Sequence, residues 1–184
     1  LAEKYGFKPF VDSDMFYSMK SGGNYYCYDT PDIIKDVAHL MPENAIVTYW
    51  DYFTSTEHCK TFIKSHRHFN RPIRFLGSVN NWGAFSPRMP SAMFWLERSL
   101  KACIEEGITD VGIAGFGDDG GENSYFANLP TYLIAAEFYN GNFDMDSIKA
   151  KFKSIVGIDF DDFMKLCYPT FFEHEDRNFH SEKI

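Results

Sequence analysis

The sequence predicts an α/β fold built from successive strand–helix units, and three observations support this prediction. Short apolar runs alternate with longer amphipathic segments, and the pattern recurs four times, at intervals of roughly 30 to 40 residues. Each apolar run is followed by a polar or aromatic cluster. The 184 residues are 45% hydrophobic and 18% aromatic, a composition typical of a globular domain with a sizeable core. Because parallel strands bring their carboxyl ends to one edge of the sheet, the four clusters are expected to share a face.

The expected strands are 8–16, 45–52, 73–79 and 111–114. The first is expected to end in Asp12 and Asp14. The last is an uninterrupted apolar run, which is typical of a fully buried strand. It is followed by Gly-Asp-Asp-Gly-Gly-Glu, where glycines allow a sharp turn and carboxylates gather at the end of the strand. An acidic turn with a helix N-cap explains this last segment equally well.

Helices are expected at 30–40, 56–68, 90–106, 124–139, 143–156 and 158–166, from apolar spacing and from start and stop signals. Thr30-Pro31-Asp32 is a helix-start signature. Several apolar residues are expected to share the buried faces of two of these helices. They are Met93, Leu96, Leu100 and Ile104 of the long helix, and Tyr125, Phe126, Leu129, Tyr132 and Leu133 of the helix after the fourth strand.

The composition argues against several classes of partner and site. A formal net charge of -8 disfavours nucleic acid or an anionic membrane surface as the main partner. No apolar run approaches transmembrane length. The four cysteines are widely spaced without a Cys-x-x-Cys motif, which favours free buried thiols over a disulfide framework or a zinc site. The spacing of His58, His66 and His68 fits a solvated helix surface as well as a metal site, and the solvated surface is the interpretation preferred. No metal and no cofactor are expected.

The strand ends are the candidate binding face. Flat aromatic rings can cover the C–H face of a sugar, and carboxylates accept hydrogen bonds from its hydroxyl groups. A single tryptophan is more often a core residue, but aromatic and acidic residues recur here at the end of every strand. The candidate residues are Asp12, Asp14, Tyr49, Trp50, Asp51, Trp82, Phe116, Asp118, Asp119 and Glu122.

Four strand–helix units are half of an eight-unit (β/α)8 TIM-type barrel, for which about 250 residues are typical. A half barrel has two unpaired sheet edges, which favour association. The chain is therefore expected to be a piece of a longer protein, pairing with a missing N-terminal half barrel, or to cover its edges by self-association. An open doubly wound sheet is the alternative, but no glycine-rich phosphate loop follows the first strand.

Four segments of the chain resemble the last four units of the glycoside hydrolase family 20 barrel. They are KPFVDSDMF, YWDYF, NNWGAFSP and GFGDDGGENSYFANLP. The last is similar to the Trp-Gly-Asp-Asp-Gly-x-Glu-Cys-Ser strand of a bacterial branch of exo-β-N-acetylhexosaminidases. IKAKFKSIVGIDFDDFMKL resembles the helical segment after that barrel. Residues 1–140 are therefore expected to be the half barrel, 141–172 helices packed on it, and 173–184 a tail.

The resemblance implies removal of a terminal β-linked GlcNAc or GalNAc with retention of configuration. In that family the acetamido oxygen of the substrate attacks the anomeric carbon, an Asp orients the acetamido group, and the adjacent Glu is the general acid, an exception to the two-carboxylate scheme. The Asp-Glu pair follows the fourth strand of the barrel. No Asp-Glu dipeptide follows a strand here, so no catalytic residue is expected in this chain and the chain alone is expected to be inactive.

By the same resemblance the chain would hold the sugar, and its partner would be a glycan with a terminal N-acetylhexosamine. Asp118 would accept sugar hydroxyls, Trp50 would line the acetamido pocket, and Trp82 would lie under the ring. Tyr49 or Tyr52 would donate to the acetamido oxygen.

Two departures from the family pattern motivate alternatives. Phe116 stands where the family has Trp, and Asp12 where a Trp is expected. One alternative is a non-catalytic carbohydrate-binding barrel. Another is a different retaining glycosidase that uses Asp118, Asp119 or Glu122.

Overall fold

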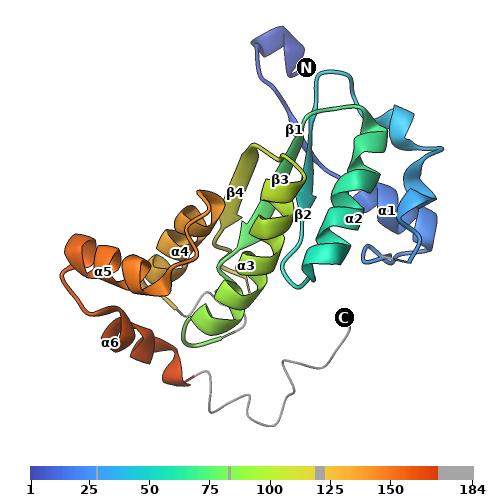
Figure 1. Cartoon of the computed structure of the whole chain (residues 1–184). Helices are drawn as coiled ribbons and strands as arrows, with labels where there is room; N and C mark the ends of the chain where they lie inside the picture. Colours follow the sequence, from blue (N-terminus) through green and yellow to red (C-terminus); the bar gives the residue numbers. More distant parts are fainter. Residues whose placement is uncertain (28, 83, 119–122, 170–184) are drawn as a thin grey trace. The chain divides into compact units, whose positions relative to one another are not determined.

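The computed structural model describes residues 1–27, 29–82, 84–118 and 123–169. Within them the chain forms a mixed α/β structure with a four-stranded parallel sheet and six α-helices (Figure 1). The strands are β1 (Phe10–Asp12), β2 (Ile46–Trp50), β3 (Ile73–Ser78) and β4 (Asp110–Ala114), and they lie in the order β1-β2-β3-β4. The predicted α/β class and the four predicted strands are confirmed.

The register is staggered, so that each of the first two strands ends beside a residue two positions before the end of its neighbour. Asp12, the last residue of β1, pairs with Thr48 of β2, and Trp50, the last residue of β2, pairs with Leu76 of β3. The residues that follow β1 and β2 therefore emerge at one edge of the sheet, as parallel strands require.

The α-helices are α1 (Asp14–Ser21), α2 (Thr56–His66), α3 (Met89–Glu105), α4 (Leu129–Tyr139), α5 (Met145–Val156) and α6 (Phe160–Met164). Short 3-10 helices are η1 (Glu3–Tyr5), η2 (Pro31–Ile34), η3 (Ala38–Leu40), η4 (Arg67–Phe69), η5 (Tyr125–Asn128) and η6 (Lys165–Cys167). Side-chain caps set several starts: Ser55 for α2, Asp144 for α5 and Asp159 for α6 each accept a backbone N–H two or three residues on. Gly157, with φ of 80°, ends α5 as its position predicts.

Two local predictions are wrong. Asp14 is the first residue of α1 and not part of the first strand. The segment 30–40 forms the 3-10 turns η2 and η3 in place of an α-helix. One physical reason is that the Pro31 carbonyl accepts a hydrogen bond from the Ser65 hydroxyl of α2, while the amide of Lys35 bonds to the carbonyl of Asp32.

Three burial predictions are also wrong. Residues 111–114 are half-buried throughout, because β4 lies at an edge of the four-stranded sheet. Ile104 of α3 is exposed, and the buried positions of that helix are Met89, Ala92, Leu96, Ser99, Leu100, Ala102 and Cys103. Tyr125, Phe126 and Leu129 are exposed, whereas Asn128, Thr131 and Ile134 are buried on the same stretch of chain. Part of the expected helix 124–139 is the 3-10 helix η5, so the predicted α-helical spacing does not apply to Tyr125 and Phe126, whereas Tyr132 and Leu133 of α4 are half-buried.

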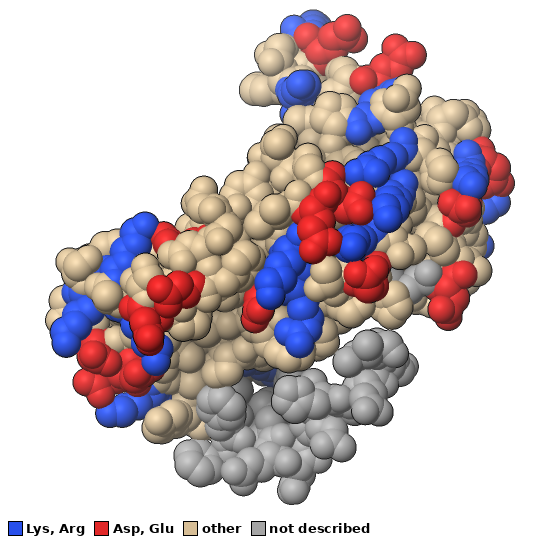
Figure 2. Space-filling model, viewed as in Figure 1, with Lys and Arg blue, Asp and Glu red and all other residues tan. Residues whose placement is uncertain are grey.

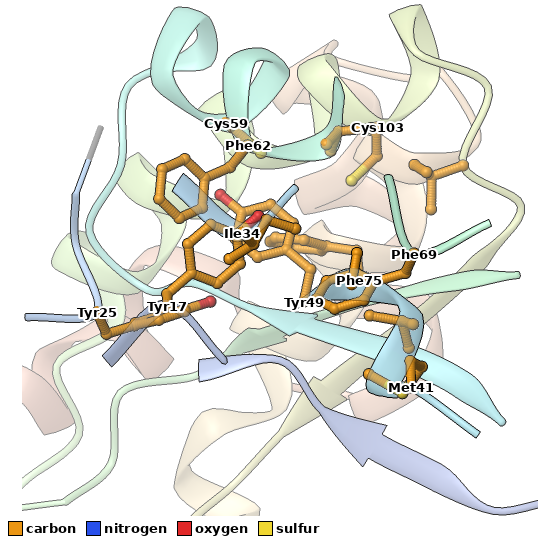
Figure 3. Close-up of a cluster of buried hydrophobic side chains, with 14 of the residues drawn as sticks. Tyr17, Tyr25, Ile34, Met41, Tyr49, Cys59, Phe62, Phe69, Phe75 and Cys103 are labelled. Atoms are coloured by element: carbon orange, nitrogen blue, oxygen red, sulfur yellow. The ribbon is translucent and has the colours of Figure 1, made fainter. Parts of the chain in front are cut away.

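The described chain divides into two compact units, the first comprising Leu1–Gly77 and Ala102–Gly112 and the second the described part of Ser78–Lys101 and Ile113–Ile184. The first unit has an aromatic-rich core (Figure 3). Phe62 of α2 stacks on Tyr17 of α1, with ring centroids 4.9 Å apart. Tyr49 of β2 contacts Phe75 of β3 edge-on at 5.4 Å. Four fully buried rings therefore join two helices of this unit to its strands.

In the second unit α4, α5 and α6 pack on one another (Figure 1). Phe152 of α5 contacts Phe160 and Phe163 of α6 edge-on, at 5.4 Å and 5.3 Å. Phe138 of α4 stacks on Phe143 at 4.9 Å. The helices expected at 143–156 and 158–166 are thus present, although α6 is shorter than expected. The tail expected at 173–184 lies outside the described residues.

The solvent side of α2 carries charges of both signs. Lys60 forms an ion pair with Glu105, and Arg67 forms one with Glu106, at 2.8 Å and 2.9 Å. Figure 2 shows blue and red side chains alternating on the face in view. Surface pairs of this kind contribute little to stability, because water and salt screen their charges. Among the helices of the described residues, none combines the length and the apolar character that a membrane crossing requires.

Candidate functional site

In the first unit the predicted carboxylates of β1 lie at the end of that strand. Asp12 is exposed at the strand end, and Asp14 begins α1 two residues later. Partial desolvation raises the pKa of Asp12, the nearby Asp14 carboxylate raises it further, and the hydrogen bond with the Thr48 side chain opposes the shift. The two carboxylates are thus close enough to influence each other electrostatically.

At the end of β2, Tyr49 and Asp51 are both buried. The Tyr49 hydroxyl donates to Oδ2 of Asp51 over 2.9 Å, and Oδ1 of Asp51 accepts from the backbone N–H of Phe53 at 3.1 Å. Tyr49 is fully buried and its ring lies 4.6 Å from that of His66. Tyr49 therefore belongs to the core and orients Asp51. Tyr52, the other tyrosine predicted as a donor, is partly exposed.

Trp50 points away from Tyr49, because successive side chains of a strand alternate. It lies in an aromatic cluster that we define as Tyr25, Tyr26, Trp50 and Tyr52. Tyr52 stacks on Trp50 with centroids 5.3 Å apart and planes 22° apart. Tyr25 lies at 4.4 Å, and Tyr26 meets the indole edge-on at 6.1 Å. The cluster is therefore centred on Trp50, at the carboxyl end of the sheet.

Sequence reasoning missed Tyr25 and Tyr26, which lie in the loop between α1 and η2. The available signal was a pair of tyrosines in a glycine-rich segment, Ser21–Tyr28, but nothing local relates them to Trp50. The Tyr25 hydroxyl donates to the Trp50 carbonyl at 2.7 Å. Burial raises the pKa of Tyr25 well above its ordinary value, and the Asp51 charge adds to the effect. The hydroxyl therefore stays protonated and keeps the loop attached to the end of β2.

The same unit contains a buried polar network around His66. Nδ1 of His66 donates to the Phe62 carbonyl at 2.6 Å, which leaves Nε2 to accept from the Ser13 hydroxyl at 2.7 Å. Tyr17 bonds to Ser65 at 2.6 Å. Burial lowers the pKa of His66 to about 4, because a charged imidazolium would lose its hydration. His66 is consequently a neutral structural residue and not part of a solvated helix surface as expected.

In the second unit the structure brings together Trp82 and Phe116, from the ends of β3 and β4. Their ring centroids are 5.7 Å apart, with the planes at 65°. Both rings are half-buried, and Asp118, two residues after Phe116, is exposed. Asp119 and Glu122 lie outside the described residues, so their predicted place in the site is not described.

Glycines after β4 allow tyrosines of the following segment to approach the backbone. A Cβ at Gly115 would lie 2.5 Å from the Tyr132 hydroxyl, and one at Gly117 would lie 2.7 Å from the Tyr125 hydroxyl. Any side chain at these positions would displace the tyrosines. Gly117, one of the glycines predicted to permit a sharp turn, and Gly115 therefore provide room for two phenol groups.

The segments that carry Trp82 and Phe116 also carry three buried asparagines. They are Asn80, Asn81 and Asn123. Sequence reasoning did not select them, and the only signal was the Asn-Asn-Trp run after the third strand. The Asn123 amide nitrogen donates to the carbonyls of Asn81 and Ala84, at 2.6 Å and 3.1 Å. This side chain therefore ties the loop after β4 to the loop after β3.

Comparison with known protein families finds no model that matches this chain, and no curated protein matches it. Within the part of the chain that the structure describes, no group of three or more His, Cys, Asp or Glu side chains is placed to hold a metal ion. The described cysteines are free and buried. The described residues that follow the strands supply aromatic rings, carboxylates, amides and phenol hydroxyls.

Proposed function

We propose that this chain is the sugar-holding half of a retaining exo-β-N-acetylhexosaminidase of the glycoside hydrolase family 20 type. The enzyme would remove terminal β-linked GlcNAc or GalNAc by substrate assistance, with the catalytic Asp-Glu pair outside this chain. The observation that carries the proposal is the aromatic cluster around Trp50. Stacked rings at the carboxyl end of a parallel sheet are a suitable surface for the C–H face of a pyranose.

The strand order supports a (β/α)8 barrel as the parent fold. A doubly wound sheet reverses its strand order at a switch point, whereas β1 to β4 follow one another in chain order. Parallel neighbours joined by right-handed crossovers place successive helices on the same face, as in a barrel. In this proposal the remaining half barrel pairs with β1 and β4, and a second copy of the chain is the alternative partner.

The structure favours Tyr52 over Tyr49 as the donor to the acetamido oxygen of the substrate. Tyr49 is fully buried, and its hydroxyl donates to Asp51. Tyr52 is partly exposed and stacks on Trp50. An oriented phenol hydroxyl would favour the attacking geometry of the acetamido group, which is the purpose of positioning in substrate-assisted catalysis.

The test is hydrolysis of two aryl glycosides by the complete parent polypeptide. We expect turnover of an aryl N-acetyl-β-glucosaminide and none of the matching aryl β-glucoside, which lacks the acetamido group. Turnover of both would replace the proposal with a retaining glycosidase that supplies its own nucleophile. Turnover of neither, with glycan binding retained, would replace it with a non-catalytic binding barrel.

Replacing Trp50 with Ala is expected to raise the KM of the parent for the aryl N-acetyl-β-glucosaminide by about tenfold, because the ring that covers the sugar is lost. Trp50→Phe, which keeps a ring, should recover much of the loss. The matched control is Trp95→Ala, since Trp95 lies within the helix α3 and not in a segment that follows a strand. An equal effect of both Trp-to-Ala changes would count against a sugar platform at Trp50.

Replacing Asp118 with Asn separates sugar holding from direct catalysis. Asp118 is exposed after β4 and would accept hydrogen bonds from sugar hydroxyls. We expect both kcat/KM and the affinity for free GlcNAc to fall by about tenfold, the amount typical of one hydrogen bond to a charged group. Abolished turnover with unchanged GlcNAc affinity would instead assign Asp118 a direct role in bond cleavage.

A further inference from the structure

Asn80, Asn81 and Asn123 in the second unit carry polar atoms that the protein does not satisfy. Their exposed fractions are 2%, 1% and 8%. Both amide atoms of Asn80, and the Oδ1 atoms of Asn81 and Asn123, are buried with no hydrogen-bond partner among the described residues. Buried polar groups are nearly always hydrogen-bonded, and exceptions in a folded protein commonly mark a bound water, ion or ligand.

Hydrogen bonds to the backbone hold the side chain of Asn123. The Asn123 amide can adopt only one orientation, because turning it over would place Oδ1 against the carbonyls of Asn81 and Ala84. Asn80 has φ of 53°, and its backbone N–H donates to Ser78 Oγ at 3.0 Å. Because Asn is favoured in the left-handed region, the backbone conformation at this position favours this residue type.

The set of unsatisfied atoms indicates the chemistry of the occupant. Three amide oxygens alone would suit a cation, but the buried Nδ2 of Asn80 also lacks a partner, and an amide N–H donates and cannot bind a cation. A hydroxyl group both donates and accepts, so it can satisfy the oxygens and the nitrogen together. The three amides are neutral, which fits an uncharged occupant.

We propose that Asn80, Asn81 and Asn123 form a binding site for hydroxyl groups, filled by ordered water in the free protein. The site adjoins Trp82, which directly follows Asn81 and contacts Phe116. A hydroxyl of a ligand bound at these rings is the second source of the same chemistry. The water site stands whether or not the chain binds sugar.

The direct test is transfer of magnetisation from water to the side-chain amide protons of Asn80, measured by NMR on the folded, isotope-labelled chain. We expect a cross-peak from long-lived water. The sign of the cross-peak distinguishes bound water from protons that exchange chemically with the solvent. Absence of this cross-peak overturns the inference. In a second spectrum, with GlcNAc as the probe, loss of the cross-peak assigns the site to a ligand hydroxyl as well. Its persistence assigns the site to water alone.

The independent test compares the thermal unfolding of Asn80→Leu and Asn70→Leu. Asn70 is the matched control because it has nearly the same φ, 51°, but is exposed. Both changes place Leu in the left-handed region, so the difference reports on the buried amide. With an occupied site, Asn80→Leu should lower Tm by about 3 °C more than Asn70→Leu, since the water would lose its partners. An equal or smaller loss for Asn80→Leu would show that the amides are empty and would overturn the inference.

Discussion

Replacing Phe62 with Ala is expected to lower the free energy of unfolding of this chain by about 3–5 kcal/mol, the range for truncating a buried aromatic ring. Phe62 is fully buried in the first unit. Its ring stacks on Tyr17 at 4.9 Å and lies 5.9 Å from Tyr49 and 6.2 Å from Tyr25. The change would leave a cavity between α1, α2 and β2, and those large rings could not collapse to fill it (Figure 3).

Urea unfolding, followed by circular dichroism, measures this loss. The control is Phe7→Ala, because Phe7 is 70% exposed and should change stability by less than about 0.5 kcal/mol. If Phe62→Ala does not fold, Phe62→Leu gives a smaller cavity and a measurable midpoint. A loss below about 1 kcal/mol for Phe62→Ala would show that the ring is not a central element of the core.

Lowering the pH from 6.5 to 4 is expected to remove about 3 kcal/mol of stability through His66 alone. Burial lowers the pKa of His66 from its ordinary 6.5 to about 4 in the folded chain. Between these two values the unfolded chain binds a proton that the folded chain excludes. Stability is therefore complete above pH 6.5, falls as the pH decreases, and reaches its new level below about pH 4.

The measurement is the free energy of unfolding at a series of pH values for the parent sequence and for His66→Asn. The variant loses the hydrogen bond with Ser13, so its stability is lower throughout, but its decline between pH 6.5 and 4 should be shallower. The comparison variant His39→Asn changes an exposed histidine and should keep the full slope. Identical slopes for all three proteins would contradict a buried, neutral His66.

Local sequence signals determined most of the secondary structure. Short apolar runs between turn residues located the strands, and capping side chains mark the starts of α2, α5 and α6, while a glycine ends α5. Such signals act within a few residues, so they can be read from the sequence. The segment 30–40 shows the limit of such signals. It begins with a helix-start signal, yet it forms 3-10 turns, and its Pro31 carbonyl accepts a hydrogen bond from the distant Ser65.

The candidate site was predicted by position, and only tertiary structure determined the role of each residue. Strand alternation requires Tyr49 and Trp50 to point to opposite sides, but it does not say which side faces the core. Packing against Phe75 and His66 decided that, so Tyr49 is buried and orients Asp51. Tyr25 joins Trp50 from a loop 25 residues away in sequence.

By itself the sequence determined the α/β class and the four strands, and it places aromatic or acidic residues after them in the chain. These properties follow from short-range patterns of polarity and backbone preference. Tertiary structure alone decided that β4 is only half-buried, that His66 is neutral, and that Asn80 and Asn123 are buried with unsatisfied amide atoms. Burial and long-range hydrogen bonds depend on which distant segments meet, and that information is not contained in any local stretch of the chain.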